Sequence, residues 1–247
     1  MDMQNRIIVS PMCQYSAKGG VAGDWHIMHI GQFAVANPGL IFLEGTAVLP
    51  DGRISDQDLC LYNDQQQEGL RRLVEFVRAN SQSKIGIQLF HSGRKGSQYK
   101  PWDNDTSYGE SDTIQIKDGG WQVCGPSAIG YDATYPVPRE LDLAELQTIK
   151  QAFVDSACRA KIAGLDTMEL HYAHGYLLHT FLSPISNQRT DDYGGSRRNR
   201  MRFPLEVFEA VRRVWPEDRP LGARISGSDF GLDEGAWDIE DLSLIHI

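Results

Sequence analysis

Apolar residues along the chain follow two kinds of pattern, short unbroken runs and longer stretches with a period of three to four residues. Five short runs predict β-strands. They are RIIV (6–9), LIFL (40–43), KIGIQL (84–89), TMEL (167–170, ending at His171) and LGARIS (221–226). A run without polar residues, such as LIFL, is typical of a strand that is buried on both faces of a parallel sheet.

The longer stretches predict four helices between these strands, and residues of capping type mark where they begin. We expect the first to start with Asp24 as N-cap and end at Asn37, and the second to follow the pair Asp64 and Gln67. The third should run from the pair Asp142 and Glu145 to Gly164. The fourth should cover roughly 197–214, unless Pro204 kinks it or delays its start. Strands joined by helical crossovers run parallel, which leaves a doubly wound sheet or a (β/α)8 barrel. A Rossmann dinucleotide site is disfavoured, because no Gly-x-Gly-x-x-Gly motif follows the first strand.

The alternation of strands and helices is interrupted at about residues 96–139. Gly, Asp, Ser and Pro are frequent there, and no period is sustained. A long irregular segment inside a compact domain usually has a function. We therefore expect it to form a lid or small subdomain over the open end of the sheet.

Composition and charge narrow the class of protein. The length of 247 residues suits one α/β barrel domain, and 41% hydrophobic and 23% charged residues are ordinary values for a globular protein. A net charge of −9 argues against a nucleic-acid partner, because phosphate binding needs a basic face. The four cysteines have no zinc-type spacing, and the sequence shows no signal peptide and no apolar run of membrane-spanning length. We expect a cytoplasmic protein with no membrane partner.

The strand at 167–170 leads into three residues with acid–base side chains, His171, His174 and Tyr176. In α/β proteins, catalytic groups collect after the carboxyl ends of strands. Histidine supplies hydrogen-bond donors and tyrosine a proton of high pKa, which suits a site that holds an anion and protonates it. The two histidines could instead bind a metal ion with His179, or be satisfied core histidines. No Cys or Glu cluster accompanies them, the context favours catalysis, and we expect no metal.

Residues 171–200, HYAHGYLLHTFLSPISNQRTDDYGGSRRNR, resemble the signature of the Old Yellow Enzyme family, the FMN-dependent ene-reductases also called NADH:flavin oxidoreductases. The His-x-x-His form is similar to the bacterial, thermophilic-type branch. The resemblance implies a (β/α)8 TIM barrel, an FMN cofactor, NADPH or NADH as hydride donor, and a small-molecule enone or nitro substrate whose C=C bond is reduced. It also implies a homo-oligomer at full length. His171 and His174 would hold the substrate's activating oxygen, and Tyr176 would protonate its α-carbon.

The resemblance extends to the first strand and the loop after it. Ser10, Pro11, Met12 and Cys13 match the motif on the flavin face. The backbone around Pro11 and Met12 would contact the isoalloxazine, and the Cys13 thiol would lie near flavin N5 and the C4 carbonyl. A polarizable thiol there can tune the redox potential. Tyr15 would hydrogen-bond the substrate oxygen.

Three more positions near strand ends match flavin contacts of the family. Gly45 would pass its backbone along the flavin pyrimidine, Gln88 would hydrogen-bond the edge of that ring, and Arg224 would lie near N1 and the C2 carbonyl. A side-chain amide suits a ring edge with both donors and acceptors. A positive charge near N1 stabilises the anionic reduced flavin.

The extent of the barrel carries further expectations. About five of eight βα units are present, so residues 1–241 would form a partial FMN-binding barrel without the strands that grip the FMN phosphate in the family. The last six residues, LSLIHI (242–247), match the translation of an adapter used in transposase-based sequencing libraries, and we expect a non-native tail. Two alternatives stay open. One is an iron–sulfur flavoprotein of the same barrel superfamily, of the dienoyl-CoA reductase or amine dehydrogenase type, and the other is an inactive truncated fragment that holds no cofactor.

Overall fold

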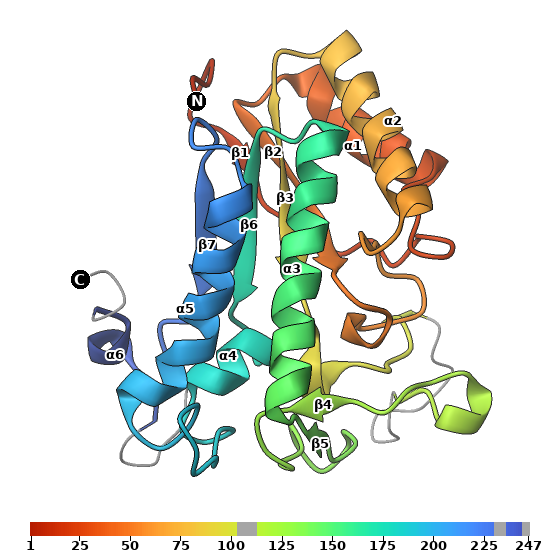
Figure 1. Cartoon of the computed structure of the whole chain (residues 1–247). Helices are drawn as coiled ribbons and strands as arrows, with labels where there is room; N and C mark the ends of the chain where they lie inside the picture. Colours follow the sequence, from red (N-terminus) through yellow and green to blue (C-terminus); the bar gives the residue numbers. More distant parts are fainter. Residues whose placement is uncertain (103–112, 230–235, 244–247) are drawn as a thin grey trace.

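A five-stranded parallel sheet forms the centre of the protein, and the long helices lie along it (Figure 1). The computed structural model describes residues 1–102, 113–229 and 236–243. The strands, in spatial order, are β1 (Ile8–Val9), β2 (Leu40–Ala47), β3 (Lys84–Phe90), β6 (Thr167–Tyr172) and β7 (Leu221–Ile225). Each strand pairs in parallel with the next one along the chain. Because chain order and spatial order agree, the sheet is part of a (β/α)8 barrel, and the predicted incomplete barrel is confirmed.

Helices connect successive strands. The four long ones are α1 (Asp24–Ala36), α2 (Asp64–Asn80), α3 (Leu143–Ala163) and α5 (Arg197–Val214), and each contacts the next. Two short helices, α4 (Leu177–Leu182) and α6 (Ile239–Ser243), follow β6 and β7. The part of the chain that the structure describes contains no helix long and apolar enough to cross a membrane.

The boundaries of α3 and α5 lie where the sequence predicts them. Asp142 and Glu145 form a reciprocal capping box, in which each carboxylate accepts the backbone N–H of the other residue at 2.8 and 2.9 Å. Gly164 ends α3 in the left-handed conformation with a φ of 93°. Pro204 lies inside α5 without ending it.

The N-caps of α1 and α2 lie one residue before the predicted ones. Gly23 and Asn63 occupy these positions, and the expected caps Asp24 and Asp64 are the first helical residues. Glycine has no side chain to accept the N–H of the third helical residue, so α1 keeps only the reciprocal half of a capping box, made by the ring of His26. Its Nδ1 accepts the Gly23 N–H at 3.1 Å.

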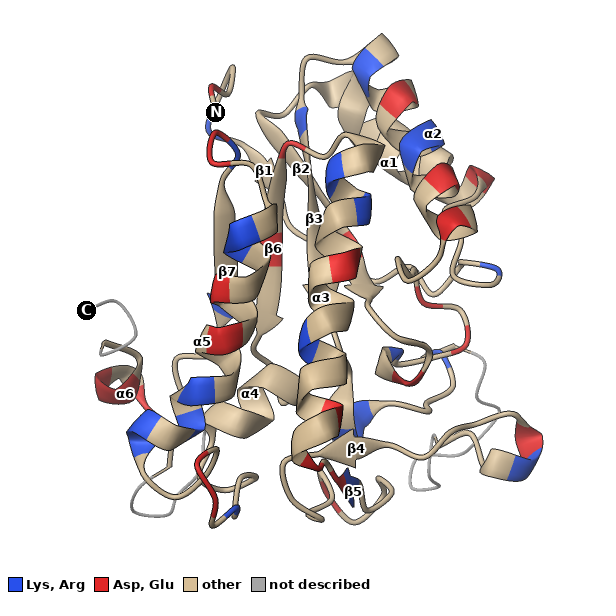
Figure 2. Cartoon of the chain, in the orientation of Figure 1, with Lys and Arg blue, Asp and Glu red and all other residues tan. Residues whose placement is uncertain are grey.

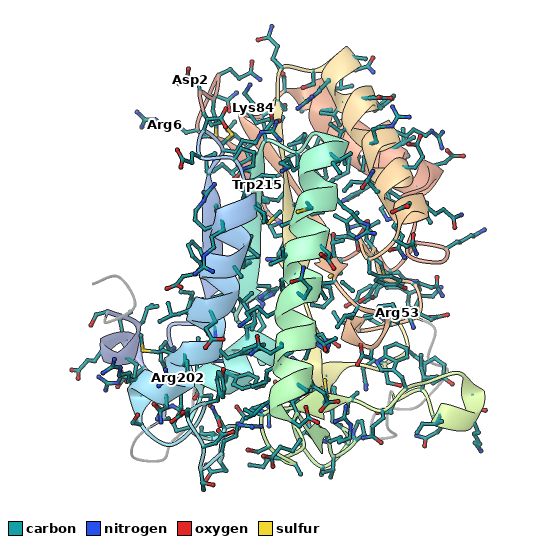
Figure 3. All side chains as sticks on the ribbon, in the orientation of Figure 1. Asp2, Arg6, Arg53, Lys84, Arg202 and Trp215 are labelled. Carbon is teal, nitrogen blue, oxygen red and sulfur yellow. The ribbon has the colours of Figure 1, made fainter. Side chains whose placement is uncertain are left out.

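Side chains alternate along the strands, so the two faces of the sheet differ in chemistry. One face packs on the helices through fully buried apolar residues such as Leu73 of α2, Phe153 of α3 and Phe203 of α5. At the far end of α5, the labelled side chain of Trp215 (Figure 3) is buried, and its indole N–H donates to the Pro220 carbonyl at 3.0 Å. This apolar layer holds the strands in register.

Polar side chains gather on the other face of the sheet. Gln88 of β3 is paired in register with Glu169 of β6, and His171 of β6 with Arg224 of β7. His171 lies inside β6, which runs two residues past the predicted end at Leu170. The strand backbone therefore fixes the direction of its side chain.

Strand β2 is irregular at Glu44. Leu43 pairs with Ile87 and Gly45 with Gln88, which leaves Glu44 as the extra residue of a bulge. The strand continues to Ala47, beyond its predicted end at Leu43. Glu44 and Gly45 therefore belong to the strand and do not follow it.

The segment at 96–139 contains only short elements in its described residues, 96–102 and 113–139. They are η3 (Ile116–Asp118), β4 (Cys124–Gly125) and the start of β5 (Arg139–Glu140); the single turns η1 (Pro50–Gly52) and η2 (Gly93–Lys95) precede it. β4 and β5 pair with each other, beyond the carboxyl ends of the main strands (Figure 1). That the segment acts as a lid stays a prediction.

Charged residues of both signs are interspersed along the helices (Figure 2). On α2, for example, Arg71 pairs with Glu68 at 2.5 Å. Of the tail at 242–247, the structure describes only Leu242 and Ser243, which end α6, and residues 244–247 lie outside the described part. The expected non-native tail stays a prediction.

Candidate active site

A cavity of about 130 Å³ lies at the carboxyl ends of the strands and collects most of the side chains that the sequence singles out. Those that line it are Pro11, Cys13, Gly45, Gln88, His171, His174, Tyr176 and Arg224. They come from the loop after β1, from strands β2, β3, β6 and β7, and from the turn after β6. Parallel strands bring residues that are distant in sequence to one rim.

Three predicted site residues lie outside this cavity. Tyr15 lines an adjoining cavity of about 250 Å³, which shares the side chains of Ile54 and Tyr176 with the first. Ser10 and Met12 line a narrow crevice beside α1, and 46% of Met12 is exposed. Tyr15 is thus adjacent to the main cavity, whereas Ser10 and Met12 do not line it.

Ile54 and Phe90 line the cavity but do not feature in the sequence prediction. Phe90 ends β3, two residues after Gln88 and on the same face, so the alternation along the strand was a usable signal. Ile54 lies in an irregular stretch after η1, where no sequence period exists. Its place in the site depends on the fold alone.

His171 is held as a neutral hydrogen-bond donor. Its Nδ1 accepts the N–H of Ala173 at 3.2 Å, so the proton of the neutral ring is on Nε2. Burial, reinforced by the nearby His174 and Arg224, lowers the pKa of His171 to about 3. The ring therefore stays uncharged at neutral pH and can donate from Nε2.

His174 stands beside His171 in a strained backbone conformation. Its φ is 61°, and the backbone is fixed on both sides, by its N–H to the Ser226 hydroxyl at 3.0 Å and by Lys95 Nζ to its carbonyl at 3.0 Å. The two imidazole rings meet edge to face with centroids 4.9 Å apart. Burial and the charges of Arg224 and Lys95 lower the pKa of His174 as well.

Tyr176 packs edge to face against His171, with ring centroids 5.0 Å apart, and against Phe90 at 5.5 Å. It is the N-cap residue of α4, which anchors its backbone. Burial, followed by the influence of Cys13, raises the pKa of Tyr176 well above its ordinary value. The phenol therefore keeps its proton in the free site.

The loop after β1 is tied to β2 through Glu44. One carboxylate oxygen accepts the N–H of Gln14 at 2.8 Å, and the other lies 3.1 Å from Nε2 of His26. The His26 N–H is not aligned for a good hydrogen bond, so this second contact is chiefly electrostatic. Burial and the negative charge of Asp58 raise the pKa of the Cys13 thiol in this loop, which remains protonated.

Gln88 and Arg224 converge on a residue that the sequence analysis overlooked, Glu169. Its Oε1 accepts Nε2 of Gln88 at 2.6 Å and Nε of Arg224 at 2.9 Å. The alternation along β6 places Glu169 on the same face as His171, which was the signal for it. A charged and an amide group thus form one polar edge of the cavity.

The cavity fits the polar edge of a flavin. A Cβ on Gly45 would lie 3.3 Å from the Phe90 ring and 3.4 Å from Oε1 of Gln88, so a side chain there would fill the space in front of the amide. Gln88 and Arg224 offer the acceptors and donors that a flavin pyrimidine needs, and Cys13 and Pro11 form the wall on the side of β1. These residues would hold the ring system of FMN.

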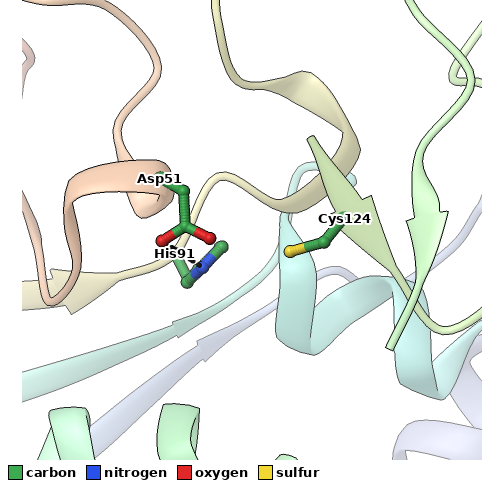
Figure 4. A group of neighbouring side chains, drawn as sticks. All are labelled: Asp51, His91 and Cys124. Atoms are coloured by element: carbon green, nitrogen blue, oxygen red, sulfur yellow. Dashed lines mark ion pairs between the residues drawn. The ribbon is translucent and has the colours of Figure 1, made fainter. Parts of the chain in front are cut away.

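A second cluster, Asp51, His91 and Cys124, brings three metal-ligand types within 4.8 Å of one another (Figure 4). Nε2 of His91 is buried without a hydrogen-bond partner, 3.9 Å from Oδ1 of Asp51. Its Nδ1 accepts the Gly93 N–H at 3.0 Å, which leaves the proton on Nε2. A metal-bound histidine needs the opposite arrangement, with a lone pair toward the ion. The cluster as it stands therefore does not suit a cation.

A parallel βα barrel with neutral histidines, a protonated tyrosine and an Arg–Gln edge at its carboxyl rim is the architecture of a flavin oxidoreductase. The chain belongs to the NADH:flavin oxidoreductase / NADH oxidase family, whose model matches residues 1–240. The resemblance seen in the sequence is thereby confirmed.

Relatives of established structure or name support this assignment. The chain is 46% identical over 236 residues to an NADPH dehydrogenase of Bacillus velezensis, covering 94% of this chain and 63% of that protein. Its fold is similar to Old Yellow Enzyme from Pichia sp. AKU4542 (TM-score 0.84, 27% identity, 99% of this chain and 63% of that one). It is also similar to morphinone reductase in complex with tetrahydroNAD (TM-score 0.80, 30% identity, 98% and 65%). The chain spans less than two thirds of each relative.

Proposed function

We propose that this chain is the substrate-binding and flavin-binding portion of an FMN-dependent enzyme that takes a hydride from NADPH or NADH and reduces the activated C=C bond of an α,β-unsaturated carbonyl or nitro compound. The observation that carries the proposal is the meeting of His171, His174 and Tyr176 with the Gln88–Arg224 edge in one cavity. The relatives named NADPH dehydrogenase and the neighbour that holds tetrahydroNAD support the choice of hydride donor. The homo-oligomer and the cytoplasmic location stay predictions.

Gln88, Arg224, Gly45 and Cys13 would hold the cofactor. Bound FMN would supply the hydride chemistry, accepting a hydride from the nicotinamide and giving it to the substrate. Arg224 places a positive charge where negative charge develops on reduction, which favours the reduced form. The Cys13 thiol, protonated in the free site, contributes polarizability and no charge.

His171 and His174 would bind the substrate's carbonyl or nitro oxygen. Reduction of the conjugated bond moves negative charge onto that oxygen, and preorganised donors stabilise it. The Nε2–H of His171 is such a donor, because its orientation is fixed by the Ala173 contact and its charge is zero. A neutral donor can bind the oxygen of the neutral substrate and also stabilise the negative charge that develops on it during reduction.

Tyr176 would protonate the α-carbon. Burial keeps its proton in place until substrate is bound. The contact with His171, at 5.0 Å between ring centroids, holds the phenol beside the oxygen-binding donors. Tyr15, in the adjoining cavity, faces the outer part of the same substrate space.

The test is the turnover of 2-cyclohexenone with NADPH by purified chain supplied with excess FMN. Loss of one oxyanion donor typically costs about 10²–10³ in rate, so His171→Ala should slow the reaction by this factor. Tyr176→Phe should slow substrate reduction while leaving reduction of the flavin by NADPH unchanged. Tyr193→Phe, which removes a phenol bonded to Glu206 and remote from the cavity lining, is the matched control. Equal turnover in all variants would refute the proposal, and a wild-type chain that binds no FMN would establish the inactive fragment.

A further inference from the structure

Glu169 occupies a central position behind the predicted flavin contacts. It lies on β6, directly opposite Gln88 of β3, and two residue pairs before the His171–Arg224 pair. Its side chain is 16% exposed and shares the polar face of the sheet with these residues. A carboxylate in this place needs partners to offset its loss of water.

A single oxygen of Glu169 serves both neighbours. Oε1 accepts Nε2 of Gln88 at 2.6 Å and Nε of Arg224 at 2.9 Å. Both bonds are charge-assisted and therefore stronger than those between neutral groups. The carboxylate is a common anchor for two side chains that come from strands on either side of it.

The contact with Glu169 determines which end of the Gln88 amide faces the cavity. Because the NH₂ group donates to the carboxylate, the carbonyl oxygen Oε1 points to Gly45, 3.4 Å from the place of a Cβ there. An acceptor at that place suits the N3–H of a flavin pyrimidine. Without Glu169, the amide could turn and present its NH₂ group, which would meet the N3–H with another donor.

The contact with Arg224 has a second consequence. Nε is engaged by Glu169, and no hydrogen bond joins the terminal nitrogens of the guanidinium to residues that the structure describes, so within this part of the chain they can serve the cavity. At 2.9 Å the negative charge also offsets part of the positive charge that Arg224 presents. The pair is thus a weaker stabiliser of negative charge than Arg224 alone.

We propose that Glu169 is a positioning residue that orients Gln88 and Arg224 toward the bound isoalloxazine ring and moderates the positive charge felt by the reduced flavin. The inference rests on the proposed function, since it concerns the same site. It goes beyond it because Glu169 touches neither substrate nor cofactor in this assignment. A purely structural ion pair would stabilise the sheet without affecting the flavin potential.

Two variants separate orientation from charge. Glu169→Ala removes the anchor, so Gln88 and Arg224 lose their orientation, and the Kd for FMN should rise at least tenfold, measured by quenching of flavin fluorescence. Glu169→Gln keeps an oxygen acceptor and removes only the charge, so the Kd of oxidised FMN should change less than threefold. In the same variant, the affinity for reduced FMN relative to oxidised FMN should be about tenfold higher than in the wild-type chain. This ratio corresponds to a two-electron midpoint potential that is higher by about 30 mV. Glu68→Gln on the exposed side of α2 makes the same charge change far from the site and should alter neither value.

A cofactor-free measurement accompanies these assays. In ¹⁵N NMR spectra of the chain without FMN, the Arg224 Nε–H and the Gln88 NH₂ signals should shift, and their exchange with water should accelerate at least tenfold, in Glu169→Ala. Unchanged signals overturn the anchoring role, and an unchanged potential in Glu169→Gln overturns the moderation of charge. If the wild-type chain binds no flavin at millimolar FMN, both the proposed function and the effect of Glu169 on the flavin potential are refuted. Shifted NMR signals in Glu169→Ala would still show that Glu169 orients Gln88 and Arg224.

Discussion

Replacement of Glu44 by alanine should loosen the loop that carries Cys13 and Tyr15. Glu44 is the bulged residue of β2, and its side chain is 4% exposed. It connects this loop with α1, beside a direct hydrogen bond from the Trp25 indole N–H of α1 to Oε1 of Gln14 at 3.2 Å. One oxygen accepts the Gln14 N–H at 2.8 Å, and the other lies 3.1 Å from Nε2 of His26. Alanine removes both contacts at once.

The magnitude follows from the groups left behind. A buried or half-buried donor that loses its partner costs about 1–3 kcal/mol, and the variant leaves one such donor, the Gln14 N–H. The His26 N–H makes no hydrogen bond to Glu44, so His26 loses only a nearby negative charge. Relief of the carboxylate's own dehydration offsets part of this cost. We expect the free energy of unfolding to fall by about 2 kcal/mol in Glu44→Ala and by about 1 kcal/mol or less in Glu44→Gln, which keeps an acceptor for the Gln14 N–H.

Urea unfolding followed by tryptophan fluorescence measures the difference. Thermolysin cleavage within residues 10–17 provides a local readout, and it should accelerate in Glu44→Ala more than global stability alone explains. The control is Glu68→Ala, whose carboxylate is exposed and pairs with Arg71 on the surface of α2. If Glu44→Ala unfolds at the same urea concentration as Glu68→Ala and is cleaved no faster, the carboxylate does not hold the loop.

Three further outcomes can be measured on the same chain. Tyr172→Phe removes the hydrogen bond that the buried hydroxyl donates to the Pro204 carbonyl at 2.7 Å. The free energy of unfolding, measured by urea unfolding, should fall by about 1 kcal/mol. No change would mean that this hydrogen bond between β6 and α5 does not stabilise the fold. His171 binds its proton only in the unfolded chain between pH 6.5 and about 3, so stability is lost as pH falls through this window. His171→Asn should reduce that slope by up to about 1.4 kcal/mol per pH unit, and equal slopes would contradict the buried neutral ring. Gly45→Ala should weaken FMN binding at least tenfold in a fluorescence titration, because its Cβ would lie 3.3–3.4 Å from the ring and amide opposite; unchanged binding would place the flavin elsewhere.

Elements with local signals were predictable from the sequence. The third helix begins and ends as expected because Asp142, Glu145 and Gly164 act within a turn of the helix end. Helix α4 was missed. It has only six residues, all of them buried, and its contacts with β6 and α5 determine it more than any sequence period does.

The candidate site was predictable to the extent that strands bring it together. His171, Gln88 and Arg224 were placed correctly at one rim because parallel strands in chain order end on the same side. Ser10 and Met12 were assigned through a family motif in which the backbone around Met12 makes the contact, so the position of their side chains beside α1 does not test the assignment. A residue that only positions other side chains, such as Glu169, is harder to predict from the sequence, because it need not belong to any motif.

The distribution of charge across the cavity connects these observations. At the substrate end, burial keeps His171 neutral and Tyr176 protonated, so the groups that would meet the enone carry no charge. At the edge where the flavin is proposed to bind, the guanidinium of Arg224 forms an ion pair with Glu169 at 2.9 Å. A neutral end suits a neutral substrate whose oxygen gains charge only during the reaction, and a moderated positive end suits a ring that alternates between two charge states. One sheet provides both ends of the cavity. Burial keeps His171 and Tyr176 uncharged at its rim, and the ion pair between Glu169 of β6 and Arg224 of β7 reduces the positive charge at the other end.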